Sequence, residues 1–131
     1  MRKLPIYIAL LLMSCSQLTI DENTAKAKVS ELIMLLKDHQ YDKTKAYYSD
    51  SFNESEPVEA RAKKFAQIEA ASGPIVSSEV TECSKQQLDD RTVVVMKYKV
   101  VCTNTTLIES FVVALEEGNY KVLKHDITNK P

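Results

Sequence analysis

Three side chains in the second half of the sequence have the functional groups for acid–base catalysis: Glu109, Tyr98 and His125. An isomerase-type site needs a carboxylate and a phenol that face one apolar cavity. Alternation along the predicted strands places Tyr98 on an apolar side, and it places Glu109 on the same side as Leu107 and Phe111. A histidine on the last predicted strand has the chemistry of a general base. These three residues are therefore the candidate catalytic residues.

A purely structural role is the alternative for two of these candidates. Near the end of its strand, Glu109 would form an ion pair with Lys97 or Lys99 across the sheet. His125 has no carboxylate beside it on its own face, because Asp126 points to the other face. A half-buried histidine at the edge of a sheet is then the simpler interpretation, and the catalytic role stays a hypothesis.

Other kinds of site lack their sequence patterns. His39 and His125, the two histidines, lie far apart in the sequence and there is no CxxC motif, so no metal site is predicted. Gly73 and Gly118 are the two glycines, too few for a loop that binds a phosphate cofactor. The net charge of −1 argues against nucleic acid as a partner. No cofactor is expected.

Cys83 and Cys102 raise the question of a disulfide. An exported protein meets an oxidising compartment, which favours the bond. A tight turn near Asp89 would instead place Cys83 opposite Met96, about six residues or roughly 20 Å from Cys102 at ~3.3 Å per residue. A disulfide needs its two Cα atoms within about 7 Å. The two arguments conflict, and the sequence leaves the disulfide open.

The first fourteen residues have the layout of a bacterial secretory signal peptide. A basic pair, Arg2 and Lys3, precedes an apolar run over residues 6–13. This run is about half of the ~20 residues that a membrane-spanning helix needs. Cleavage between Ser14 and Cys15 would remove two basic residues and leave a mature chain with a net charge of about −3.

The end of that segment resembles the cleavage site of bacterial lipoproteins. Leu12 and Ser14 stand three and one residues before Cys15, where the lipoprotein pattern has an aliphatic and a small residue. The resemblance implies that Cys15 becomes the acylated first residue of the mature protein and binds the lipid bilayer. Ser16 is not the aspartate associated with retention in the inner membrane, so the resemblance implies the outer membrane, facing the periplasm.

The remaining chain predicts an α+β fold, with three N-terminal helices packed on a curved four-stranded antiparallel sheet. Helices are expected at 24–38 (capped by Asn23 or Thr24), 43–49 and 57–71, with a loop over 50–56. Strands are expected at 75–86, 92–103, 107–115 and 120–127. The predicted parts are a signal peptide at 1–14, a lipidated tether at 15–23, one domain at 24–128 and a tail at 129–131.

Between Ala25 and Ile127 the sequence resembles small exported proteins of the nuclear transport factor 2-like superfamily, which have a cone-shaped α+β fold. The matching features are the turn before Tyr41, the segment from Tyr47 to Phe52, the turn at residues 72–74 and the ending from Glu117 to Val122. The tryptophans of that family are absent, and Tyr120 stands at one of their positions. The resemblance implies a cone cavity. It does not imply one function, because this superfamily contains both enzymes and binding modules.

Three functions fit these observations. The first is a lipid-anchored module of the periplasm that binds a small ligand or an envelope protein. The second is a small isomerase or hydrolase that uses the cone cavity. The third is a structural or immunity-type lipoprotein that recognises one partner protein. The scarcity of acid–base groups favours the first and the third.

Overall fold

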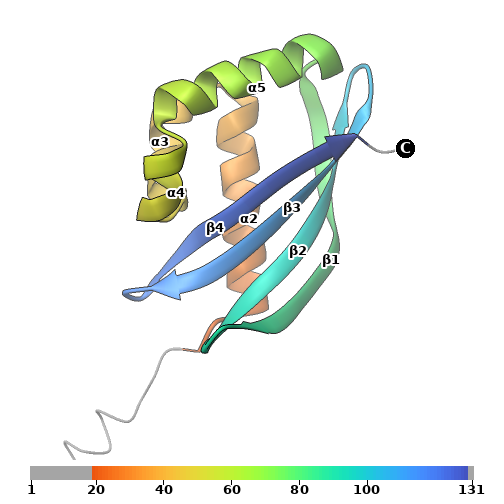
Figure 1. Ribbon diagram of the computed structural model, residues 1–131. Coiled ribbons are helices and arrows are strands. Elements are labelled where there is room, and N and C mark those ends of the chain that lie inside the picture. The colour runs from red at the N-terminus through yellow and green to blue at the C-terminus, as the bar shows by residue number, and fades with distance from the viewer. Residues whose placement is uncertain (1–18, 130–131) are drawn as a thin grey trace, which may run out of the picture.

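The computed structural model describes residues 19–129, which form an α+β domain with one four-stranded antiparallel sheet (Figure 1). The helices lie N-terminal to the sheet, as predicted. The predicted signal peptide 1–14, the cleavage site at Ser14 and the acylated Cys15 lie outside the described residues. Among residues 19–129, no helix combines the length and apolar character needed to cross a bilayer.

The helical part is more broken than predicted. It contains α2 (Glu22–Lys37), α3 (Tyr41–Thr44), the 3-10 turn η1 (Lys45–Tyr47), α4 (Asp50–Ser55) and α5 (Val58–Ser72). The expected loop over 50–56 is wrong, because Ser49 caps a helix there by accepting a hydrogen bond from the Phe52 amide at 3.2 Å. The expected helix over 43–49 ends early, because Tyr48 has an extended backbone.

The first long helix begins before its predicted start. Asp21, rather than Asn23 or Thr24, is its N-cap, and the Asp21 carboxylate accepts hydrogen bonds from the Thr24 amide and hydroxyl, both at 2.8 Å. The Asp21 amide donates to the Tyr120 hydroxyl at 2.9 Å, and Ile20 is buried. The predicted tether at 15–23 is therefore too long, since residues from Ile20 onward belong to the folded domain.

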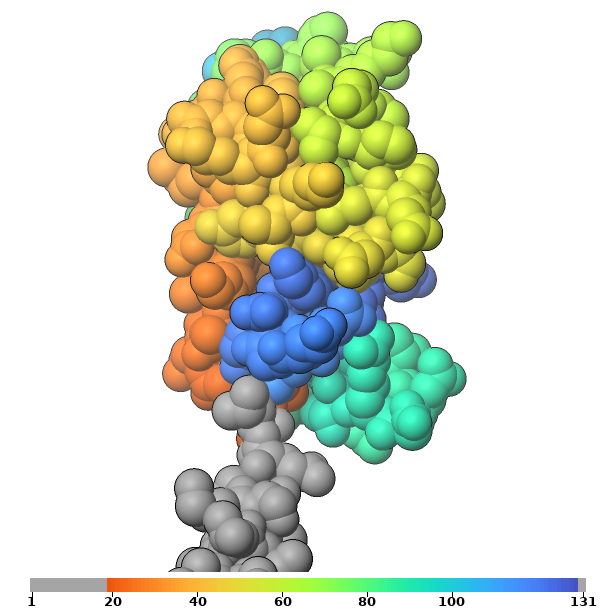
Figure 2. Space-filling view, turned by 90° about the vertical axis from the view of Figure 1, so that its left-hand side faces the viewer, coloured from red at the N-terminus to blue at the C-terminus, as the bar shows by residue number. Residues whose placement is uncertain are grey.

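The four strands pair in sequence order as a meander of hairpins. They are β1 (Ile75–Leu88), β2 (Arg91–Cys102), β3 (Thr106–Glu116) and β4 (Asn119–Asn129). The β1–β2 turn contains Asp89 and the β3–β4 turn contains Glu117 and Gly118, and the backbone φ of all three residues is positive, as tight hairpin turns require. These two turns lie at the end of the domain where α2 begins, and α5 crosses the opposite end (Figures 1 and 2).

The core lies between α2 and one face of the sheet (Figure 1). Residues of α2 at helical spacing are buried there: Ala25, Val29, Leu32, Ile33 and Leu36. Every second residue of β2 from Val94 to Cys102 is buried against them. Met34 is 52% exposed on the outer side of α2, so this helix covers the sheet with one face only.

The two edges of the sheet differ. The helical segment covers the β4 edge, where Tyr48 forms a parallel bridge with Val122 and the Ser49 amide donates to the Val122 carbonyl at 2.9 Å. The β1 edge has no such cover among the described residues, and its register with β2 shifts twice, after Ile75 and after Val80. Such bulges hinder the addition of another strand to an open edge. The covered edge fixes Tyr48 beside β4.

Candidate functional site

A chain of three polar side chains runs through the core from the helices to the sheet. His125 of β4 lies with Nε2 2.6 Å from Oε1 of Glu109 on β3. The other ring nitrogen, Nδ1, lies 2.9 Å from the hydroxyl of Tyr48. Tyr48 and Glu109 are 1% and 2% exposed, and the His125 side chain is fully buried. The structure thus brings together two predicted catalytic residues and adds a third residue that was not predicted.

The direction of the hydrogen bonds follows from the chemistry of the groups. Burial strongly raises the pKa of the Tyr48 hydroxyl, which therefore keeps its proton and can donate it to Nδ1. His125 then carries its own proton on Nε2 and donates it to the Glu109 carboxylate. Each nitrogen of the His125 ring therefore has a hydrogen-bond partner, one from the helical part of the protein and one from the neighbouring strand.

Aromatic rings hold His125 in place. Phe111, which is opposite His125 in the β3–β4 register, stacks on the imidazole at a centroid distance of 4.2 Å. Phe65 of α5 lies on another side at 5.9 Å. The ring of Tyr48 stacks on Phe52 of α4 at 4.4 Å. The hydrogen-bonded chain is therefore enclosed by rings from three different elements, and water has little room beside it.

A fully buried arginine continues this network on the helical side. The guanidinium of Arg61 on α5 lies 4.0 Å from the centroid of the Tyr48 ring. Its nitrogens donate to the Thr44 hydroxyl at 2.9 Å, the Asn53 side-chain oxygen at 2.8 Å and the Glu56 carboxylate at 3.3 Å. Arg61 thereby joins α3 and α4 to α5, and Tyr48 lies in the segment between α3 and α4.

Tyr98, the third predicted catalytic residue, is not part of this chain. It is opposite Glu109 in the β2–β3 register and buried, but its hydroxyl donates to the Lys26 carbonyl of α2 at 2.9 Å and lies 3.2 Å from the Ser30 hydroxyl. Burial raises the pKa of this phenol. Tyr98 therefore anchors α2 to the sheet, and it does not line the cavity that Glu109 lines.

The surroundings predicted for Glu109 and His125 under a structural role are both wrong. Glu109 does not reach solvent or pair with Lys97 or Lys99: it is buried, and its partner is His125. Lys97 lies 4.0 Å from Glu82 of β1. His125 is buried rather than half-buried, because helices cover the edge of β4. The sequence of β4 alone could not predict this contact, because the carboxylate partner of His125 lies on the neighbouring strand β3.

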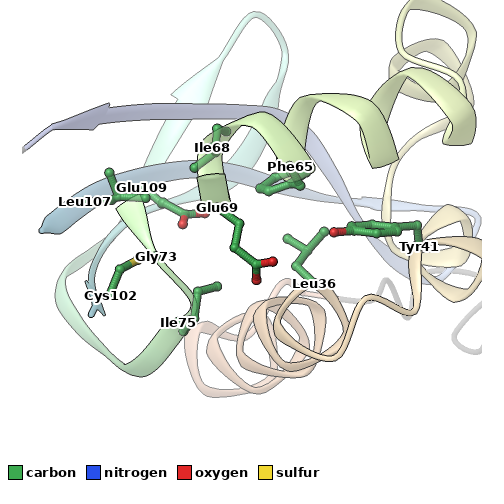
Figure 3. Close-up of a pocket in the computed structure, with 10 residues that line it drawn as sticks. All are labelled: Leu36, Tyr41, Phe65, Ile68, Glu69, Gly73, Ile75, Cys102, Leu107 and Glu109. Carbon is green, nitrogen blue, oxygen red and sulfur yellow. The ribbon is translucent and has the colours of Figure 1, made fainter. Parts of the chain in front are cut away.

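A small cavity lies beside Glu109, at one end of the hydrogen-bonded series of Tyr48, His125 and Glu109 (Figure 3). Its volume is about 20 Å³, room for a single water-sized group. Its apolar walls are Leu36, Phe65, Ile68, Ile75 and Leu107. Its polar groups come from Tyr41, Glu69, Cys102 and Glu109. This volume is far below the ~300 Å³ or more of a typical ligand pocket, so the cavity does not enclose a substrate.

The structure contains no disulfide between Cys83 and Cys102, a bond that the sequence left open. The β1–β2 register places Cys83 opposite Met96, as the tight turn implied, and places Cys102 opposite Ile75 at the far end of β1. Both cysteines are free thiols. Burial raises the pKa of each thiol, so neither is primed as a nucleophile. Among the described residues no group of three or more His, Cys, Asp or Glu side chains could hold a metal ion.

Sequence reasoning missed Tyr48 and Arg61. Arg61 did carry a signal, because it precedes Phe65 and Ile68 by four and seven residues and therefore lies on the buried stripe of α5. A charged residue on such a stripe calls for buried partners. Tyr48 carried no comparable signal, because its position depends on the segment that closes the β4 edge.

Comparisons with known proteins gave no match to this chain among family models, curated proteins or solved structures.

Proposed function

We propose that this protein is a bacterial lipoprotein, anchored by an acylated Cys15, whose domain binds a ligand or an envelope protein without catalysis. The observation that supports binding without catalysis is that the acid–base groups are enclosed in the core. Tyr48, His125 and Glu109 are hydrogen-bonded to one another in the core, and the cavity beside them admits a single water-sized group. A catalytic site has to place such groups against a substrate.

The anchor is supported by the sequence at residues 1–15 and by where the domain begins. The described chain starts at Thr19, four residues after Cys15, and Ile20 is already buried in the core. Four extended residues span roughly 14 Å at most. The acyl chains would therefore hold the domain close to the membrane, with the α2 start and both tight hairpins toward it (Figure 2). The lack of Asp at position 16 supports the outer membrane.

The anchor is tested by growing cells with an alkyne analogue of palmitate. The wild type should take up the label, and Cys15→Ala should lose it. Cys83→Ala is the matched control, because it removes a cysteine from β1 without touching the proposed lipidation site. A wild-type protein that takes up no label, or a Cys15→Ala variant that keeps it, would exclude the anchor.

An enzyme remains the second candidate, and the 2.6 Å contact between Glu109 and His125 is the observation that favours it. Such a dyad can act as a general base if the cavity widens. Widening it by Ile68→Ala should then create or increase turnover of small isomerase or hydrolase substrates, and a further Glu109→Gln change should abolish it. If the Ile68→Ala variant shows no turnover, the enzyme hypothesis is excluded and the binding function is the one that remains.

The order of the helices and the four-stranded meander supports a nuclear transport factor 2-like fold for this binding domain. Its partner is either a small ligand or one envelope protein, as for an immunity-type lipoprotein. Affinity capture from detergent-solubilised envelopes, with the Cys15-anchored protein as bait, separates these. A single stoichiometric protein would indicate the protein partner, and its absence would indicate the small ligand.

A further inference from the structure

We infer that the hollow between η1 and the β3–β4 turn binds a phosphomonoester, carried by a small soluble molecule or by a lipid headgroup. The inference deepens the ligand-binding function proposed above and rests on it. The hollow is lined by Lys28 of α2, by Ala46 and Tyr47 of η1 and by residues 118–121. Figure 2 shows the β3–β4 turn (blue) between α2 (orange) and the helical segment (yellow).

The size of this hollow separates it from the cavity beside Glu109. Its volume is about 530 Å³, within the ~300–1,000 Å³ of typical ligand pockets, whereas the cavity beside Glu109 has about 20 Å³. Lys28 and Asn119 on its walls are exposed, so a ligand reaches it without any rearrangement of the domain. A small ester with several carbon atoms therefore fits here and not beside Glu109.

Two lysines give the hollow a positive charge. Lys28 and Lys121 line it, and none of its seven lining residues is acidic. Among residues 19–129, neither lysine forms an ion pair, whereas Lys64, Lys97 and Arg91 each pair with a glutamate. Two cations that line one hollow without a carboxylate partner attract an anion to it.

Contacts within the fold position the donors on the β4 side. The Lys121 ammonium donates to the Ala46 carbonyl at 2.7 Å, which uses one of its three N–H groups. The Tyr120 hydroxyl accepts from the Asp21 amide at 2.9 Å, and no described residue accepts the proton of this hydroxyl. Lys121 and Tyr120 therefore keep donors for a ligand while their side chains are held in place.

A phosphomonoester matches these donors better than other anions do. It carries a charge of about −1.5 to −2 at neutral pH and three terminal oxygens, and lysine binds phosphate as a point charge. A carboxylate would balance one lysine only. The Tyr47 ring, whose hydroxyl donates to Glu31 at 2.8 Å, lies 5.9 Å from the Lys28 ammonium and provides an apolar wall for the carbon atoms of the ester.

The test is a titration followed by two-dimensional nitrogen–proton NMR. The sample is the full chain with Cys15→Ala in a non-ionic detergent, which removes the proposed lipid and leaves residues 19–129 unchanged. Glycerol 3-phosphate should shift the amide signals of Tyr47, Gly118 and Lys121 in a saturable manner. Glycerol, and sodium chloride at the same ionic strength, should not do so. Equal shifts with sodium chloride, or no saturable shift with glycerol 3-phosphate, would overturn the inference.

Charge-removing variants locate the site. Lys28→Gln and Lys121→Gln each remove one of its two positive charges and should weaken glycerol 3-phosphate binding about tenfold. Lys63→Gln on α5 is the matched control, because Lys63 is exposed and does not line the hollow. Lys28 is also exposed, so its variant keeps the fold. Unchanged affinity in Lys28→Gln, or an equal loss in Lys63→Gln, would contradict the site even if Lys121→Gln fails to fold.

A second ligand separates the two sources of the phosphate group. Dihexanoyl phosphatidic acid carries the phosphomonoester on a lipid, and dihexanoyl phosphatidylcholine, a phosphodiester, is its control. Tighter binding of the phosphatidic acid identifies a lipid headgroup, and tighter binding of glycerol 3-phosphate identifies a soluble ester. Palmitate labelling of the wild-type chain is measured alongside. A chain that is labelled but binds neither phosphomonoester overturns this site and leaves the anchor standing.

Discussion

The hydroxyl of Tyr48 lies 2.9 Å from Nδ1 of His125, although the two residues are 77 positions apart in the sequence. One belongs to the helical half of the chain and the other to the last strand. Their contact exists because the backbone of Tyr48 bridges to Val122 and lies along the edge of β4. The hydrogen bond between Tyr48 and His125 thus connects the helical part to the sheet, and aromatic rings surround it.

Tyr48→Phe removes this contact while keeping the ring. His125 then has a buried nitrogen without a partner, which costs about 1–3 kcal/mol of the free energy of unfolding. Urea denaturation measures the loss. Tyr47→Phe is the control, since the Tyr47 hydroxyl bonds to Glu31 at an exposed position and its removal should cost less than about 1 kcal/mol. Equal losses in the two variants would show that the buried hydrogen bond of Tyr48 contributes no more to stability than the exposed hydrogen bond of Tyr47.

Arg61→Met tests the buried guanidinium. The change leaves the Asn53 and Thr44 oxygens without this donor and leaves the Glu56 carboxylate with Lys64 alone, so we expect a loss of about 3–5 kcal/mol in the free energy of unfolding. Lys63→Met on the exposed side of α5 is the matched control and should change stability by less than about 0.5 kcal/mol. A variant as stable as the wild type would mean that the apolar side chain packs as well as the ion network.

Gly73→Ala tests the contact between the end of α5 and the β2–β3 turn. Gly73 has φ of +83°, and a Cβ atom there would overlap the Thr103 side chain. Gly118→Ala is the control, because Gly118 has a similar φ of +80° but lies in an exposed turn, where the left-handed backbone alone costs roughly 1–2 kcal/mol. We expect a larger fall in melting temperature for Gly73→Ala. Equal falls would show that Thr103 moves aside freely.

Alkaline pH should destabilise the fold through its tyrosines. Burial is the main cause that raises the pKa of Tyr41, Tyr48 and Tyr98, and the hydrogen bond to Glu31 raises that of Tyr47. Unfolded tyrosines ionise near pH 10, so above about pH 10 the unfolded chain has lost protons that the folded chain keeps. This contribution is therefore fully present below about pH 10 and is lost as the pH rises further.

The measurement is the free energy of unfolding in urea between pH 8 and pH 11, together with the phenolate absorbance. Both should change in the same pH range, because buried phenols ionise when the chain unfolds. Tyr98→Phe should flatten the fall, since it removes one of the perturbed groups. Phenolate that appears well before unfolding would show that these hydroxyls are more accessible than the structure indicates.

Local sequence patterns were enough to predict the α+β class and the four strands, and the tight turn near Asp89 placed Cys83 opposite Met96, although the disulfide stayed open. Alternating residues and turn-forming residues are local signals, and neighbouring strands of a meander pair locally. The sequence also has the pattern of an export signal and a cysteine for the proposed anchor, and this pattern is recognised without knowledge of the fold.

The polar contacts of the core depend on the three-dimensional arrangement of the elements. Glu109 finds His125 because β3 and β4 pair in one register, and Tyr48 joins them because the helical segment closes the β4 edge. Tyr98 shares the inner face with Glu109 yet bonds to α2 instead. Such contacts depend on how helices dock on the sheet, and that docking is set by the sum of many packing contacts rather than by any short stretch of sequence.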